Sequence, residues 1–155
     1  MTIYMTSIQT LLEDALKDPT LAASIDIEKL LETSQDSNFL GRSMETVTKE
    51  IVVILEEELS LDEKVSEFSA KLLGYQYIDR VCDIRLGRFI RWIKRGTLVL
   101  HRGGILSSID VKDSGIVLLC KNVKNGFFRL KYEDCILFQQ LSLEEKMILS
   151  LESSL

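Results

Sequence analysis

The chain has 155 residues, of which 46% are hydrophobic, and a formal net charge of −5 at pH 7. A chain of this length can bury one ordinary hydrophobic core, or two small ones, without disulfides or a metal ion. No apolar run reaches the roughly 18 to 20 residues that a membrane-spanning helix requires. No basic residue precedes Lys17, so we expect neither a secretory signal nor an Arg-rich transit peptide. We therefore expect an intracellular protein, cytoplasmic or nuclear, without a membrane span.

The first part of the chain, residues 1–79, is predicted to be an acidic helical region. Leucine and alanine recur at helical spacing over residues 11–16, and Pro19 is expected to end that helix. A second helical segment is expected to continue through Leu31.

Two further helices are predicted after that segment. Ser43 has the side chain of a helix N-cap, and the helix that it opens ends in the acidic triplet 56–58. These carboxylates lie at the unfavourable end of the helix dipole, so we expect them to face solvent or a basic partner. Ser60 followed by Glu63 has the spacing of a capping box, and the helix after it is expected to end at Gly74.

Charge is distributed unevenly along the sequence. Residues 1–79 hold 6 basic and 16 acidic side chains, residues 80–131 hold 12 and 3, and residues 132–155 hold 1 and 5. The net charges of the three segments are therefore −10, +9 and −4. The overall acidity conceals a basic module between two acidic ones.

From about residue 84 the hydrophobic pattern changes from helical spacing toward alternation. The segment 86-LGRFIRWIKRG-96 fits either period, but its aromatic and β-branched residues and its flanking glycines favour a first strand. Turns of hairpin length separate the remaining predicted strands. These are expected at residues 97–111, where the glycine pair bends one strand or separates two, and at residues 116–121, 127–132 and 135–140. Ser142 with Glu145 forms a second capping box, which opens a short C-terminal helix.

In order and loop length, these strands resemble the SH3-like small barrel, a group that includes Tudor-type and Sm-like modules. The resemblance implies an α+β protein with an N-terminal helical region, an SH3-like small antiparallel β-barrel and a short C-terminal helix. The predicted domains are an acidic helical region (1–79), a basic SH3-like β-barrel (80–140) and a C-terminal helix (141–155). A Tudor-type peptide reader would need an aromatic cage, for which the aromatic residues are too few and too scattered.

Residues that carry catalysis or hold metal ions are sparse. His101 is the only histidine, and no local pattern joins it to a cysteine as a nucleophile pair. Cys82, Cys120 and Cys135 have the spacing of neither zinc ligands nor a disulfide framework. The glycine pair 103–104 lacks the context of a phosphate-binding loop and is expected to bend a strand. We therefore expect no enzyme, cofactor, metal ion or small-molecule substrate.

The basic residues of the predicted barrel form the strongest candidate binding surface. In one interpretation they contact nucleic-acid phosphates on one exposed face while an exposed Trp92 stacks on a base. In the other they meet acidic protein, in a partner or a second copy, and Trp92 is buried. We favour the second, because the acidic helical region would oppose the approach of phosphate. The candidate basic residues are Arg85, Arg88, Arg91, Lys94, Arg95 and Arg102.

Three short stretches, 87-GRFIRWI-93, 103-GGIL-106 and 133-EDC-135, resemble uncharacterised structural proteins of large DNA viruses. The resemblance implies a virion component, such as a minor capsid or cementing subunit, and carries over no residue with an assigned role. The sequence thus predicts a non-enzymatic structural or interaction protein of a larger assembly. Nucleic-acid binding by the basic barrel face is the alternative.

Overall fold

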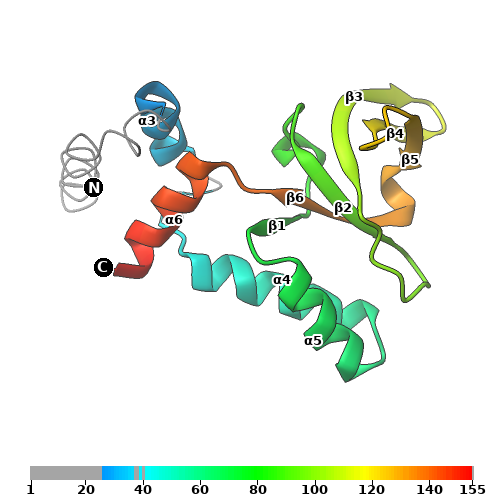
Figure 1. The fold of residues 1–155 in the computed structure, drawn as a ribbon, viewed down its shortest axis with the longest axis horizontal. Helices are drawn as coiled ribbons and strands as arrows, with labels where there is room; N and C mark the ends of the chain where they lie inside the picture. The colour runs from blue at the N-terminus through cyan, green and yellow to red at the C-terminus, as the bar shows by residue number, and fades with distance from the viewer. Residues whose placement is uncertain (1–25, 37–38, 40, 155) are drawn as a thin grey trace. The chain divides into compact units, whose positions relative to one another are not determined.

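A computed structural model shows an α+β protein (Figure 1). The residues that the structure describes are 26–36, 39 and 41–154. The chain divides into two compact units. The helical unit combines residues 1–47 with residues 141–155, and the sheet unit is the continuous stretch 48–140.

Helices build the described part of the helical unit. They are α3 (Ile27–Gln35), the first residues of α4 (Met44–Glu58) and α6 (Leu143–Ser154). The predicted capping box of α6 is confirmed, because the Ser142 and Glu145 side chains accept each other's backbone N–H at 3.1 and 2.8 Å. The Ser43 cap of α4 is confirmed as well, since Thr46 N–H donates to Ser43 Oγ at 3.2 Å. The core residues of this unit are Leu30, Phe39, Val47, Leu141, Ile148 and Leu149.

Helix α3 runs past Leu31 to Gln35, further than its hydrophobic pattern indicates. The helix predicted over residues 11–16, with its end at Pro19, lies outside the described residues.

The sheet unit contains one six-stranded antiparallel sheet in the order β1-β6-β2-β3-β4-β5. The strands are β1 (Tyr75–Ile78), β2 (Phe89–Lys94), β3 (Gly104–Lys112), β4 (Gly115–Lys121), β5 (Phe127–Lys131) and β6 (Cys135–Gln140). The other elements of this unit are the rest of α4, helix α5 (Asp62–Lys71) and the single-turn helices η1 (Val81–Asp83) and η2 (Tyr132–Asp134). The strand interpretation of residues 86–96 is confirmed for Phe89–Lys94.

The capping box predicted at Ser60 is wrong. Helix α5 begins at Asp62, and its N-cap is Leu61, which makes no side-chain capping bond. Asp62 and Glu63 therefore both lie in the first turn, where the helix dipole favours carboxylates without a cap. Gly74 does take the left-handed conformation after the helix, with φ of +84°.

The sheet is open, so the predicted closed barrel is not observed. The described strands include β1, which pairs with β6 and lies within the region predicted to be helical. Strand β5 pairs with β4 at the other edge, and no described pairing joins β5 to β1. The sequence pattern missed this strand because β1 has only four residues, too few to show alternation. Tyr75 and Tyr77, two residues apart, both pack against the core beneath the helices.

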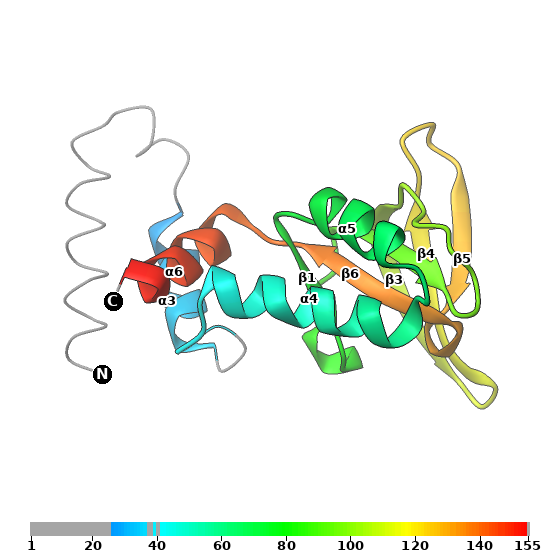
Figure 2. The ribbon, with the colours of Figure 1, turned by 90° about the horizontal axis from the view of Figure 1, so that it is seen from below.

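The two faces of the sheet carry separate cores. On one face, α4 and α5 lie against β1, β6 and β2 (Figure 2). This helix-covered core contains Ile51, Leu55, Leu59, Val65, Phe68, Leu72, Ile93, Ile136 and Phe138. On the other face the sheet curls, so that residues of β4 pack in one cluster with residues of β2 and β6. This inner core contains Ile78, Ile84, Ile90, Trp92, Leu106, Leu118, Cys120, Cys135 and Leu137.

The glycine pair lies where the curl begins. Strand β3 pairs with β2 at only two positions, Phe89 with Ile105 and Ile90 with Gly104. A Cβ on Gly103 would lie 1.7 Å from the Ile90 carbonyl oxygen, and the φ of Gly103 is +88°. Only glycine permits this close approach, so packing accounts for the residue without a ligand.

Candidate functional site

Alternation along β2 sends neighbouring side chains to opposite faces of the sheet. Ile93 lies in the helix-covered core, whereas Trp92 lies in the inner core. The same rule separates the basic residues that follow, because Arg91 and Arg95 share the face of Ile93 and Lys94 shares the face of Trp92. The predicted basic residues therefore do not converge on one surface.

The arginines on the helix-covered side bond to their own chain. Arg91 donates from Nε to the His101 carbonyl at 3.0 Å and from Nη1 to the Lys71 carbonyl, in α5, at 3.5 Å. The guanidinium of Arg95 forms an ion pair with Glu58 at the end of α4. Both side chains thus join the helices and loops of their own unit, and part of the donor capacity of each guanidinium is engaged there.

Two more of the predicted cations also bond to nearby backbone. Arg85 donates from Nη1 to the Cys82 carbonyl at 2.9 Å, and Arg88 donates from Nη1 to the Gln140 carbonyl at 3.3 Å. Of the predicted basic residues, only Lys94 and Arg102 line the pocket described next.

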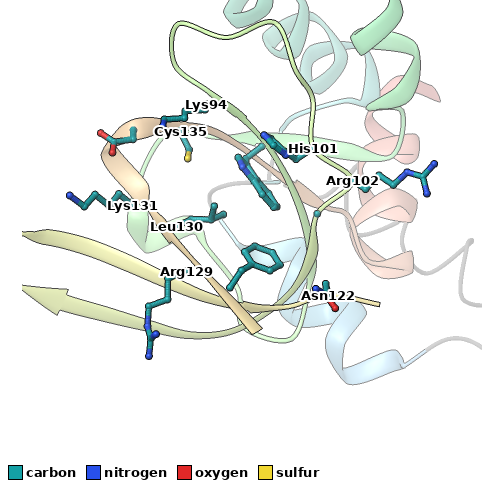
Figure 3. A pocket seen from close by; sticks show the side chains of 12 residues that line it. Lys94, His101, Arg102, Asn122, Arg129, Leu130, Lys131 and Cys135 are labelled. Atoms are coloured by element: carbon teal, nitrogen blue, oxygen red, sulfur yellow. The ribbon is translucent and has the colours of Figure 1, made fainter. Parts of the chain in front are cut away.

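A pocket of about 580 Å³ opens where β2 and β3 separate. Strand β2, the loop before β3, the β4–β5 hairpin and the start of β6 supply its walls (Figure 3). The lining residues are Trp92, Lys94, His101, Arg102, Gly103, Asn122, Phe128, Arg129, Leu130, Lys131, Asp134 and Cys135. Its volume lies within the range of sites that hold small molecules or protruding side chains.

The floor of the pocket is aromatic. The Trp92 and His101 rings are stacked, with centroids 4.8 Å apart and an interplanar angle of 10°. The Phe128 ring lies 5.0 Å from the Trp92 ring and is tilted by 34°. Trp92 is only 9% exposed, so the exposed stacking platform expected by the nucleic-acid interpretation is absent at this residue. The buried Trp92 ring packs against the ring of His101, whose side chain is exposed.

Four cations form the rim, and we refer to Lys94, Arg102, Arg129 and Lys131 as the basic rim. Figure 3 shows the side chains of Arg102, Arg129 and Lys131 directed away from the pocket interior, where solvent is accessible. Within the described residues, none of the four side chains forms a hydrogen bond or an ion pair. Asp134 is the one carboxylate among the lining residues. The rim therefore keeps positive charge available for an external anion.

Sequence reasoning missed half of this rim. Arg129 and Lys131 alternate with Phe128 and Leu130 along β5, which places the cations outward and the apolar side chains toward the inner core. That alternation is visible in the sequence, yet nothing in it places β5 beside β2. Asn122 was missed as well, and its Oδ1 accepts from Gly126 N–H at 2.9 Å, which holds the hairpin loop.

The thiols near the pocket are unsuited to nucleophilic chemistry. Burial, followed by the proximity of Cys135, raises the pKa of Cys120 to about 12. Burial and then the Asp134 carboxylate raise the pKa of Cys135, whose Sγ points toward the pocket interior in Figure 3. Thiols with raised pKa values are poor nucleophiles and poor metal ligands at neutral pH. Over residues 26–36, 39 and 41–154, no three potential ligands among His, Cys, Asp and Glu gather around one point.

Comparisons of this chain with protein-family models, with curated proteins and with solved structures yield no match. In the described part of the chain, every helix is too short or too polar to cross a membrane. The geometry of the pocket is therefore what a functional proposal has to rest on.

Proposed function

We propose that this chain is a non-enzymatic interaction protein whose sheet unit binds an acidic segment of a partner protein in a larger assembly. One observation carries the proposal: an apolar and aromatic floor lies inside a rim of four cations that have no hydrogen bond or ion pair within the described residues. An apolar side chain flanked by carboxylates matches both features. The floor removes the apolar side chain from water, and the rim attracts the carboxylates.

A protein segment fits this pocket better than a nucleic acid does. Single-stranded nucleic acids are bound on open grooves with exposed aromatic faces, whereas Trp92 is 9% exposed and covered by neighbouring rings. Arg91 and Arg95, which a phosphate-binding face would need, already bond within the unit.

We further propose that β2 to β6 are an SH3-like small barrel in a partly open form. Support comes from the order of the elements: a first strand, a long bulged strand β3, two hairpin-connected strands, the single turn η2 and a closing strand β6. Strands β6 and β2 also pair, so the first and last strands of this set are neighbours. In this proposal β1, α4 and α5 are additions: β1 extends the sheet beside β6, and α4 and α5 cover the outer side of β6 and β2.

The test is a fluorescence-anisotropy titration of the full chain with two labelled probes of equal charge. One is the acidic peptide Glu-Glu-Leu-Asp-Glu, and the other is a single-stranded oligonucleotide. We expect the peptide to bind more tightly, to bind less tightly as salt is raised, and to lose about tenfold or more in affinity in the variant Lys94→Glu/Arg102→Glu. A peptide with Ser in place of Leu should bind more weakly, because it lacks the side chain that fills the floor.

Matched controls separate the pocket from general charge. Lys112→Glu changes an exposed lysine of the β3–β4 hairpin, outside the pocket lining, and should leave peptide binding unchanged. Tighter binding of the oligonucleotide, lost in the Lys94→Glu/Arg102→Glu variant, would replace this proposal with nucleic-acid binding. Failure of both probes to bind would overturn it outright.

A further inference from the structure

The turn between α4 and α5 has the properties that the pocket requires of a ligand. We refer to residues 56–63 as the acidic turn. Its carboxylates Glu56, Glu57, Asp62 and Glu63 are exposed, and within the described residues they form no hydrogen bond or ion pair. Between them, Leu61 is 49% exposed and makes no capping contact as the N-cap of α5. An apolar side chain is thus presented among four carboxylates.

The acidic turn is held in a fixed place on the sheet unit. Leu59 and Val65, on either side of Leu61, are both buried in the helix-covered core. Glu58 is tied to β2 through its ion pair with Arg95. This anchoring means that the turn is preorganised, so ordering it on binding costs little.

The same anchoring prevents the turn from reaching the pocket of its own chain. Leu59 and Val65 belong to the core on one face of the sheet, whereas Trp92 and Phe128, which form the pocket floor, belong to the inner core on the other face. The sheet lies between them. The acidic turn and the pocket floor thus pack on opposite faces of the sheet, which favours a meeting between two copies.

We infer that the acidic turn of one copy docks into the pocket of a second copy, with Leu61 against the aromatic floor and the flanking carboxylates beside the basic rim. The inference rests on the proposed function and names the partner as a second copy of this chain. The contact is heterologous, because two different surfaces meet, so it propagates into a ring or filament unless two copies dock reciprocally. The separation of the acidic and basic segments along the sequence fits such an arrangement.

Complementation of two assembly-defective variants provides a decisive experiment. The pocket variant, Lys94→Glu/Arg102→Glu, keeps an intact acidic turn, and the turn variant, Glu57→Lys/Asp62→Lys, keeps an intact pocket. Sedimentation velocity over a concentration series should show wild-type self-association that weakens with salt, and association about tenfold or more weaker for each variant alone. An equimolar mixture of the two should form a discrete heterodimer, since one intact turn and one intact pocket remain.

Control variants and the peptide titration make the outcomes distinguishable. Lys112→Glu and Asp113→Lys reverse exposed charges in the β3–β4 hairpin and should leave self-association unchanged. Circular dichroism and thermal melting verify that each variant is folded. A monomeric wild type that still binds the acidic peptide, or a mixture without heterodimer, would overturn the inference and leave the proposed function standing. Self-association that the variants do not weaken, with no peptide binding, would overturn both.

Discussion

The two faces of the sheet unit place similar residues in opposite circumstances. On the helix-covered face, Ile93 is fully buried beneath α4 and α5, and the neighbouring Arg95 is paired with Glu58. On the inner face, the aromatic floor remains accessible through a pocket, and the Lys94 ammonium forms no hydrogen bond or ion pair within the described residues. The first face has its partners within the chain, whereas the second retains both apolar surface and charge for an external one.

The contrast between the two faces separates residues that stabilise the fold from residues that can bind a partner. A cation that is bonded inside its own unit contributes to stability and offers little to a partner, while a cation without such bonds does the reverse. Adjacent positions on one strand can therefore have separate roles. Substitutions on the two faces should affect different measurements.

The largest expected effect comes from truncating the helix-covered core. Ile93→Ala should lower the free energy of unfolding by about 2 to 5 kcal/mol, because a fully buried side chain is lost and a cavity remains. Leu130→Ala, in the half-buried pocket wall, should cost less but weaken binding of the acidic peptide. Urea denaturation measures the first quantity and anisotropy the second. Equal losses of unfolding free energy in Ile93→Ala and Leu130→Ala would contradict the distinction between the two faces.

A smaller effect separates the adjacent cations. Arg95→Gln removes a partly exposed ion pair with Glu58 and should cost about 0.5 to 1 kcal/mol of stability without changing peptide affinity. Lys94→Gln should change stability by less than about 0.5 kcal/mol and weaken peptide binding. Thermal or urea unfolding together with the anisotropy titration checks both. The comparison fails if Lys94→Gln proves the more destabilising of the two.

The smallest effect concerns the inner core at alkaline pH. Well below pH 9.0, the ordinary pKa of a thiol, both folded and unfolded states keep the Cys120 proton, and the contribution of this group to stability is fully present. As the pH rises from 9.0 toward the folded-state pKa of about 12, the unfolded state ionises first and stability falls. The free energy of unfolding, measured by urea denaturation between about pH 8 and pH 11, should therefore fall less steeply with pH in Cys120→Ala than in the wild type.

The exposed thiol Cys82 supplies the control for this measurement. Cys82→Ala should follow the wild-type pH profile. Identical slopes for the wild type and Cys120→Ala would show that burial of Cys120 does not hold its proton in the folded state.

Much of the secondary structure was predictable because its causes are local. The capping box of Ser142 with Glu145 and the Ser43 cap act over three residues, so the sequence contains the whole interaction. The strand at residues 89–94 was predictable from aromatic and β-branched content. The Ser60 box failed because α5 begins one residue later than the signal indicates, at Asp62 with Leu61 as its N-cap.

The candidate site was only partly predictable. Lys94 and Arg102 were named from the sequence, whereas Arg129 and Lys131 join them only because the sheet curls and brings β5 beside the start of β6 and the end of β2. Trp92 was identified as important, yet its burial depends on His101 and Phe128, which come from two other segments. No spacing rule relates these three residues.

Local signals in the sequence are enough to predict the α+β class, the antiparallel strands that follow the helices, the caps of α4 and α6 and the uneven distribution of charge. These features depend on backbone preferences and on contacts between residues a few positions apart. The tertiary structure alone decided that β1 pairs with β6 and that the sheet stays open. It also decided which cations bond within the chain and which remain at the pocket, because alternation along β2 and the curl of the sheet assign each side chain to a face.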